Sequence, residues 1–187
     1  MRGGGAMILA MLLGAAQAAA PQRLLDCTQI GQAAMTSREE GLPEPGRATD
    51  VQLLATHSLC GGWAIIDMWR SGYGPSATWR ARRKVMDRFG RLTVSTTEAV
   101  DCPVLMAVLT NLNDVPISPS VIPRRNKADR FPPPITLDGT WFTLHIPSSE
   151  QSDRSRANVT ISGNDGPVAH WAEASMKQLE PCWRPAA

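Results

Sequence analysis

The chain of 187 residues is close to neutral, with 19 Lys and Arg against 17 Asp and Glu. This balance favours no class of partner by charge alone, so it gives no support to nucleic-acid binding. The length suits one domain whose core needs neither a metal ion nor a partner chain, and we therefore expect a single domain over residues 21–187.

The first 20 residues are typical of an export signal. Arg2 gives a short positive start, residues 6–13 form an apolar run, and small residues suited to a signal peptidase follow. We expect cleavage after Ala20, although Ala18 also fits. The apolar run is shorter than the roughly 20 residues of a spanning helix, and no later run is long enough. The sequence therefore predicts a signal peptide at residues 1–20 and a periplasmic or secreted protein with no transmembrane segment after cleavage.

Four cysteines follow this signal: Cys27, Cys60, Cys102 and Cys182. An even number of cysteines in an exported chain predicts two disulfides. No C-x-x-C pair is present, so the spacing of a thioredoxin-like redox centre or a zinc ribbon is missing. We expect no metal and no cofactor.

The clearest strand signal lies in residues 77–89, where apolar and basic residues alternate with a period of two. Together with the β-branched and aromatic residues 63–70, across a Gly- and Pro-containing turn, this run predicts an antiparallel hairpin. We expect another strand to begin near Val51. Residues 21–37 are ambiguous, and residues 38–50 predict an exposed loop. The alternation predicts buried Trp79, Val85 and Phe89 on one face, and solvent-exposed Arg80, Arg82 and Lys84 on the other.

The apolar period then changes to three and four, which predicts an amphipathic helix over residues 101–113. Asp101 can cap its start and Pro103 is tolerated in its first turn. Residues 115–134 carry six prolines and fit no regular element. Loops of this length are usually functional or mobile.

Residues 135–146 predict a second hairpin, because Asp138 and Gly139 suit a two-residue type I′ turn. A short strand at 157–162 and a final helix at 167–180, opened by Pro167, follow. The predicted fold is α+β: an antiparallel sheet built from two hairpins, two main helices packed on one face, and two disulfides.

The predicted helices suggest how the cysteines pair. If the two helices lie antiparallel on one face, Cys102 at the start of the first meets Cys182 after the end of the second. Cys27 is then left to bond Cys60 and fix the N-terminal segment.

Catalytic chemistry has few candidates. His145, near Asp138, and His57, beside Ser58, are the only hints of a general base. The chain has no G-x-S-x-G, no H-E-x-x-H and no phosphate-binding glycine loop. His170 and Glu173 lie opposite the apolar side of the last helix, which indicates a solvated face rather than a metal site.

Basic and aromatic residues offer a binding surface. The basic strand and the loop near residue 125 could bind an anionic ligand, although the same strand pattern is typical of a solvated face. Trp141 shares a hairpin face with His145 and could fill a groove. The candidate binding residues are Arg80, Arg82, Lys84, Arg124, Arg125 and Trp141.

These observations favour an exported, disulfide-stabilised protein of the cell envelope that acts by binding a protein or an anionic envelope polymer. A secreted hydrolase using His145 or His57 is the first alternative. A purely structural envelope component is the second. Binding is favoured over catalysis.

Overall fold

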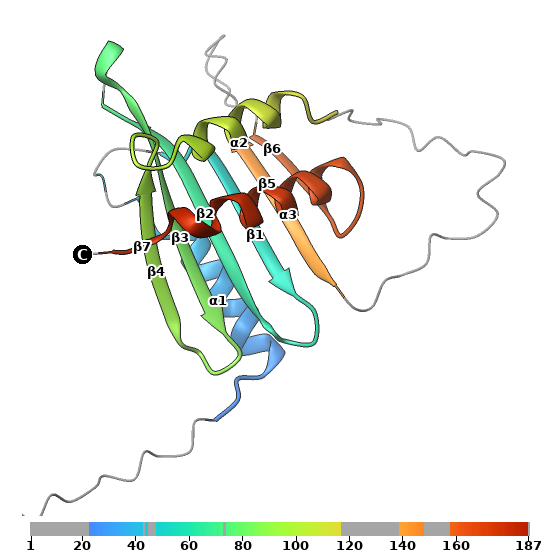
Figure 1. Ribbon diagram of the computed structural model, residues 1–187. Helices are drawn as coiled ribbons and strands as arrows, with labels where there is room; N and C mark the ends of the chain where they lie inside the picture. Colours follow the sequence, from blue (N-terminus) through green and yellow to red (C-terminus); the bar gives the residue numbers. More distant parts are fainter. Residues whose placement is uncertain are drawn as a thin grey trace, which may run out of the picture.

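The structure, a computed structural model, describes residues 23–42, 44, 48–72, 74–116, 139–147 and 158–186. These residues build a seven-stranded antiparallel sheet in the order β6-β5-β1-β2-β3-β4-β7, together with three α-helices (Figure 1). The helices are α1 (Cys27–Glu39), α2 (Pro103–Asn113) and α3 (Pro167–Leu179). The strands are β1 (Val51–His57), β2 (Gly62–Ser71), β3 (Thr78–Asp87), β4 (Leu92–Glu98), β5 (Thr140–Pro147), β6 (Asn158–Gly163) and β7 (Arg184–Pro185).

The main core lies on the sheet face that α2 and α3 cover, as the sequence predicted (Figure 1). Leu105 and Val108 of α2 and Leu179 of α3 are fully buried there against β1, β2 and β5. The two helices contact each other, and the indole Nε1 of Trp171 donates to the carbonyl of Val108 at 3.2 Å. The α+β fold with an antiparallel sheet is confirmed.

The first predicted hairpin is confirmed: β2 and β3 pair antiparallel from Gly62 opposite Asp87 to Ser71 opposite Thr78. Trp79 and Val85 are half-buried and pack against the main core, on the face that the alternation predicted. Phe89 is not part of that core: it lies beyond the end of β3, half-buried, with the guanidinium groups of Arg88 and Arg91 against its ring. Strand β4 was not predicted, because its Ser- and Thr-rich sequence has few apolar residues to show a period of two. It pairs with β3 along seven residues.

Strand β5 lies between β1 and β6 and pairs antiparallel with both. The first arm of the predicted second hairpin, residues 135–137, and its turn residue Asp138 lie outside the described residues. Gly139 is described, has a positive φ of 154°, and donates its N–H to the Ser58 hydroxyl at 3.0 Å. The strand predicted at 157–162 is present as β6.

Both main helices begin and end close to the predicted residues. Pro103 and Pro167 each occupy the first turn of their helix. An N–H group there has no intrahelical acceptor, so the N–H that proline lacks costs no hydrogen bond. The expectation that Asp101 caps α2 is wrong. Cys102 holds the N-cap position without a side-chain hydrogen bond, and its backbone N–H donates to the carbonyl of Glu98 at 2.9 Å.

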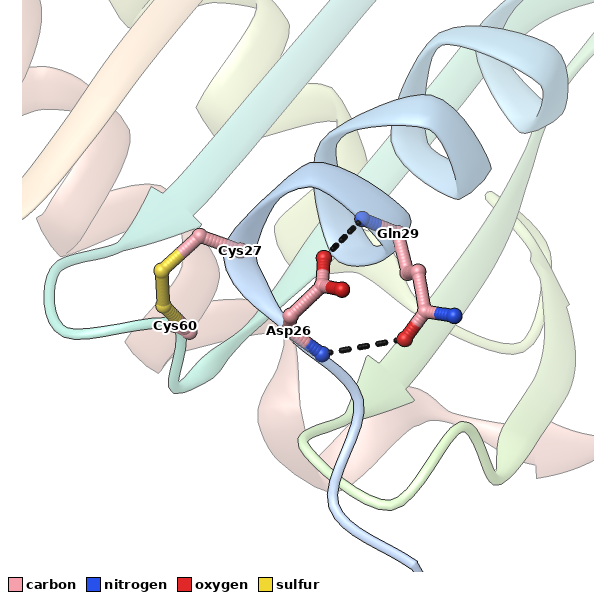
Figure 2. Close-up of a disulfide and its surroundings, with 4 residues drawn as sticks. All are labelled: Asp26, Cys27, Gln29 and Cys60. Atoms are coloured by element: carbon pink, nitrogen blue, oxygen red, sulfur yellow. Dashed lines mark hydrogen bonds between the residues drawn. A yellow bond between two sulfur atoms is a disulfide. The ribbon is translucent and has the colours of Figure 1, made fainter.

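Both predicted disulfides are present, Cys102–Cys182 with Cα atoms 5.7 Å apart and Cys27–Cys60 with Cα atoms 4.9 Å apart. The first joins the start of α2 to the short turn after α3, so the start of one helix does meet the end of the other. The second ties the start of α1 to the turn between β1 and β2 (Figure 2).

Helix α1 settles the ambiguous N-terminal segment. Asp26 and Gln29 form a reciprocal capping box at its start, with hydrogen bonds of 2.8 and 3.1 Å (Figure 2). Ile30 and Ala34 then pack a second, smaller core against Leu54, Trp63 and Ile65 on the sheet face opposite α2 and α3. Both faces of the sheet are therefore partly covered.

This helix overturns the expected exposure of the basic strand face. Lys84 is only 1 % exposed and Arg82 lies beneath the end of α1, whereas Arg80 keeps about a third of its side chain in solvent. The alternation placed these residues on the correct face of β3. The error was to assign that face to solvent, because the covering helix has few apolar residues to reveal it.

Several expectations concern residues outside the described part of the chain. These are the signal peptide at 1–20, most of the proline-rich segment 115–134, and Arg124 and Arg125 within it. Among the described helices, none has the length and apolar character needed to cross a membrane.

Candidate functional site

A row of polar side chains crosses the sheet on the α1 face. Residues directly opposite each other in antiparallel strands point to the same face. Six neighbouring strands each contribute one directly opposed residue to this row. From β6 to β4 the row consists of Thr160, His145, Gln52, Asp67, Arg82 and Thr96.

The middle of this row is a buried hydrogen-bond network. Asp67, 2 % exposed, accepts from Arg82 Nη2 at 2.8 Å and from Gln52 Nε2 at 2.8 Å. Gln52 Oε1 accepts in turn from Nε of Arg38, on α1, at 3.0 Å. The side chains of Asp67, Gln52 and Arg82 thus each have a hydrogen-bond partner within this network, as a low-dielectric environment requires. The network fixes the end of α1 over the sheet.

The remaining basic residues of β3 are also paired within the fold. Nζ of Lys84 donates to the carbonyl of Ser37 and lies 2.8 Å from Oε2 of Glu40. Arg80 forms ion pairs of 2.8 Å with Glu44 and with Glu98. The hydrogen bond and the charge of Lys84 hold the pKa of Glu40 below its ordinary value, although partial burial opposes them. The β3 cations therefore neutralise nearby carboxylates instead of presenting a basic surface.

Beyond α1, the sheet face over β5 and β6 has no described covering element; Figure 1 shows α1 behind the middle of the sheet. We call this region the open shelf, and it consists of Trp141, Thr143, His145, Thr160 and Ser162. The Trp141 side chain is 50 % exposed. Thr143 and Ser162 share a hydrogen bond of 2.9 Å, as do Nδ1 of His145 and Thr160. The shelf combines one exposed aromatic ring with neutral hydrogen-bonding groups.

A pocket of about 420 Å³ lies where the open shelf meets α1. Its lining includes Arg38 and Glu39 of α1, Gln52 of β1 and His145 of β5, and the full set adds Met35, Ala48 and Thr49. Burial of the imidazole, and the positive charge of Arg38 beside it, hold the pKa of His145 below its usual value near 6.5. This environment favours the neutral form of the imidazole.

The second histidine candidate lies at the other end of β1. His57 is exposed, and its Nδ1 is 3.0 Å from the Thr140 hydroxyl. Among the described residues, the hydrogen-bond partners of His57 and His145 are hydroxyl groups, and no carboxylate orients either ring. A Ser–His–Asp arrangement, in which a carboxylate fixes the imidazole, is therefore not assembled from the described side chains.

The face of α3 that the sequence assigned to solvent is exposed. His170 lies 3.3 Å from Asp165, an exposed pair, and Glu173 is exposed as well. Within the described ranges, no group of three or more His, Cys, Asp or Glu residues is arranged to hold a metal ion.

A larger cavity lies elsewhere. It measures about 760 Å³ and lies between α2 and the sheet, with Trp79, Leu109 and Ile146 in its lining. It contains none of the residues that the sequence analysis proposed for binding or catalysis. The candidate site is therefore the open shelf with its smaller pocket.

The structure places two of the proposed site residues, Trp141 and His145, at the two ends of the open shelf. His57 lines a small pocket of about 200 Å³ together with Trp141. Arg80, Arg82 and Lys84 lie on the same sheet face but in the part near α1, where they are paired. Sequence reasoning missed Arg38 and Gln52, and it missed the hydroxyl groups of β6. The alternation of polar residues in β6 was visible, but the partner strand that aligns Thr160 with His145 was not.

Comparisons of this chain with protein-family models, with curated proteins and with solved structures find no match.

Proposed function

We propose that this protein is an exported, disulfide-stabilised binding protein of the cell envelope, and that its open shelf binds a glycan strand. The observation that carries the proposal is Trp141, half exposed on a sheet face beside hydroxyl groups from two strands. The two disulfides are compatible with an oxidising compartment.

The chemistry of the shelf suits a sugar polymer. A tryptophan ring offers a flat apolar surface against which the C–H face of a sugar can pack, and its indole keeps a polar edge. Thr143 and Ser162 offer hydroxyl groups that both donate and accept hydrogen bonds, as sugar hydroxyls do. Binding sites commonly combine an aromatic wall with a few placed polar groups.

The shape of the shelf favours an elongated ligand. Trp141 and His145 are four residues apart on β5, which corresponds to about 13 Å along an extended strand. Both point to the same face. A polymer running along β5 and β6 could therefore contact both ends of the shelf, whereas a single small molecule could not.

The paired cations of β3 do not support the expectation that the ligand is a strongly anionic polymer. Arg80, Arg82 and Lys84 are held by carboxylates of the same chain. A protein partner fits less well, because interface cores are rich in clustered aromatic and apolar groups and the shelf has one such ring. A glycan matches the exposed groups of the shelf, which are one tryptophan ring and several hydroxyl groups.

One observation supports the hydrolase alternative. The Thr160 hydroxyl and the His145 imidazole are 2.9 Å apart, which is within reach for a nucleophile and its base. The third, orienting group of such a site is missing among the described residues. If the chain were a hydrolase, Thr160→Ala and His145→Ala would abolish release of soluble sugar from envelope glycan.

The test is binding of the full mature chain to insoluble envelope glycan and to its soluble fragments, by co-sedimentation and calorimetry. Trp141→Ala should weaken binding by about tenfold or more, since loss of an aromatic anchor commonly costs over 1 kcal/mol. The control is Val100→Ala, which removes another exposed apolar side chain, 77 % exposed, in the turn before α2. Equal binding by wild type and Trp141→Ala would overturn the proposal.

A further inference from the structure

We infer that the pocket between α1 and β5 binds the carboxylate of an acidic sugar within the glycan, with Arg38 and His145 as the recognising residues. This inference rests on the proposed function and deepens it. It assigns the open shelf a ligand that is neutral along most of its length and carries one negative charge at a defined place.

The guanidinium of Arg38 is oriented before any ligand arrives. Its Nε donates to Gln52, and Gln52 is held by the buried carboxylate of Asp67, which is itself paired with Arg82. No described residue accepts a hydrogen bond from the terminal Nη nitrogens of Arg38. A guanidinium that is fixed through Nε and lines a pocket suits a carboxylate, which can accept two parallel N–H hydrogen bonds.

His145 contributes the second donor. Its Nδ1 is engaged by the Thr160 hydroxyl, so its Nε2 is the nitrogen left for a ligand. When the hydroxyl donates to Nδ1, the neutral ring carries its proton on Nε2 and can donate into the pocket. A bound carboxylate would also offset the charge of Arg38, which now helps keep the imidazole neutral.

Glu39 restricts the charge of the ligand. It lies in the same pocket lining and is exposed, so it opposes the entry of a second negative charge. Among the described residues that line this pocket, the charged ones are Arg38 and Glu39, both from α1, while Asp67 lies behind Gln52 and is already paired. This arrangement favours a singly charged carboxylate over a phosphate dianion.

The pocket is continuous with the shelf through His145, which belongs to both. A sugar ring packed on Trp141 and a carboxylate held by Arg38 would therefore lie at opposite ends of one bound chain. The neutral contacts supply affinity for the polymer, and the pocket selects strands that carry an acidic sugar.

The experiment compares two matched probes, xylotriose carrying a single glucuronic acid and the methyl ester of that acid, binding to the mature chain in calorimetry. Wild type should prefer the acid by about tenfold or more. Arg38→Gln should remove this preference and leave ester binding unchanged, whereas Arg38→Lys should retain part of it. The matched control is Arg70→Gln, an exposed arginine away from the pocket, which should behave as wild type.

The outcomes separate the two proposals. Equal affinity of wild type for acid and ester, or equal loss of both in Arg38→Gln, overturns the carboxylate pocket and keeps the glycan shelf. Acid binding that survives Trp141→Ala overturns the shelf and keeps the pocket. Absence of binding to either probe counts against both.

A spectroscopic readout distinguishes recognition from a structural role of Arg38. The pKa of the His145 imidazole, followed by NMR, should rise when the acidic probe is added and should stay constant with the ester. If the acid leaves the pKa of His145 unchanged while it binds, His145 does not face the carboxylate and the inference fails.

Discussion

Nζ of Lys84, in the middle of β3, lies 2.8 Å from Oε2 of Glu40, the residue that follows α1. The lysine also donates to the carbonyl of Ser37 in the last turn of the helix. A cation near the C-terminal end of a helix is favourable because the unpaired carbonyls there carry partial negative charge. The buried lysine thus joins the smaller core to the end of α1 by charge rather than by apolar contact.

This pairing makes stability depend on pH. The hydrogen bond from Lys84 lowers the pKa of Glu40 in the folded state from its ordinary value near 4.5. The stabilisation is therefore fully present above pH 4.5 and is lost as the pH falls through the folded pKa. We expect the free energy of unfolding to drop below pH 4.5, and to drop less in Glu40→Gln. Urea unfolding measured between pH 7 and pH 3 would check this.

The control for that series is Glu39→Gln. Glu39 is the neighbouring exposed carboxylate, and it forms no ion pair with a described residue. Its variant should follow the wild-type pH profile. A profile that is flattened equally by both substitutions would show that the acid sensitivity comes from general charge and not from the Lys84–Glu40 contact.

The elements that local patterns determine were predictable from the sequence. Alternation in β3, the three-and-four period of α2 and α3, and prolines at helix starts are each properties of a few neighbouring residues. The disulfide pairing followed once those helices were placed antiparallel. Trp141 and His145 were placed on one face by the same period of two.

What sequence reasoning could not supply were contacts between distant segments. Lys84 and Glu40 are 44 residues apart, and α1 presents only Ile30 and Ala34 as buried apolar residues, so its covering role left little periodic signal. Arg38 joined the candidate site through a glutamine on a different element. The placement of β5 beside β1, which creates the shelf, depends on pairing across more than 80 residues of chain.

Removing one partner of the buried Asp67–Arg82 ion pair should strongly lower the free energy of unfolding. Asp67→Ala leaves the nearly buried guanidinium of Arg82 without its partner, and we expect a loss of about 3–5 kcal/mol. The double variant Asp67→Ala with Arg82→Met should lose less than the sum of the two single variants, because it leaves no unpaired charge. A double-mutant cycle by urea unfolding measures the difference.

A matched surface pair provides the comparison. Asp101 and Arg184 approach to 4.0 Å, and both are largely exposed. Asp101→Ala should change stability by less than about 0.5 kcal/mol. Additive losses in the Asp67–Arg82 cycle would contradict the claim that the two side chains act as a buried unit.

The two disulfides should differ in their contribution. Their sequence separations are 80 for Cys102–Cys182 and 33 for Cys27–Cys60. The chain-entropy model then gives upper estimates of about 4.5 and 3.7 kcal/mol. Cys102 is also fully buried in the main core. We expect Cys102→Ser with Cys182→Ser to lower the thermal midpoint more than Cys27→Ser with Cys60→Ser, and the reverse order would contradict this reasoning.

The turn that Cys60 anchors contains a strained residue that can be relieved. Leu59 has a φ of 54°, Cys60 has a φ of 57°, and Gly61 donates its N–H to the Ser58 carbonyl at 3.2 Å. These angles are typical of a type I′ turn, in which asparagine or glycine is preferred at the first central position because other side chains clash with the backbone. The Leu59 side chain is 84 % exposed, so it gains little from burial that would offset this cost.

Leu59→Asn should therefore stabilise the chain by about 1 kcal/mol. Thermal unfolding with both disulfides intact measures this, and Leu92→Asn, at an exposed leucine with which β4 begins, is the control that should bring no gain. A loss of stability in Leu59→Asn would mean that the exposed leucine makes contacts that outweigh its backbone strain.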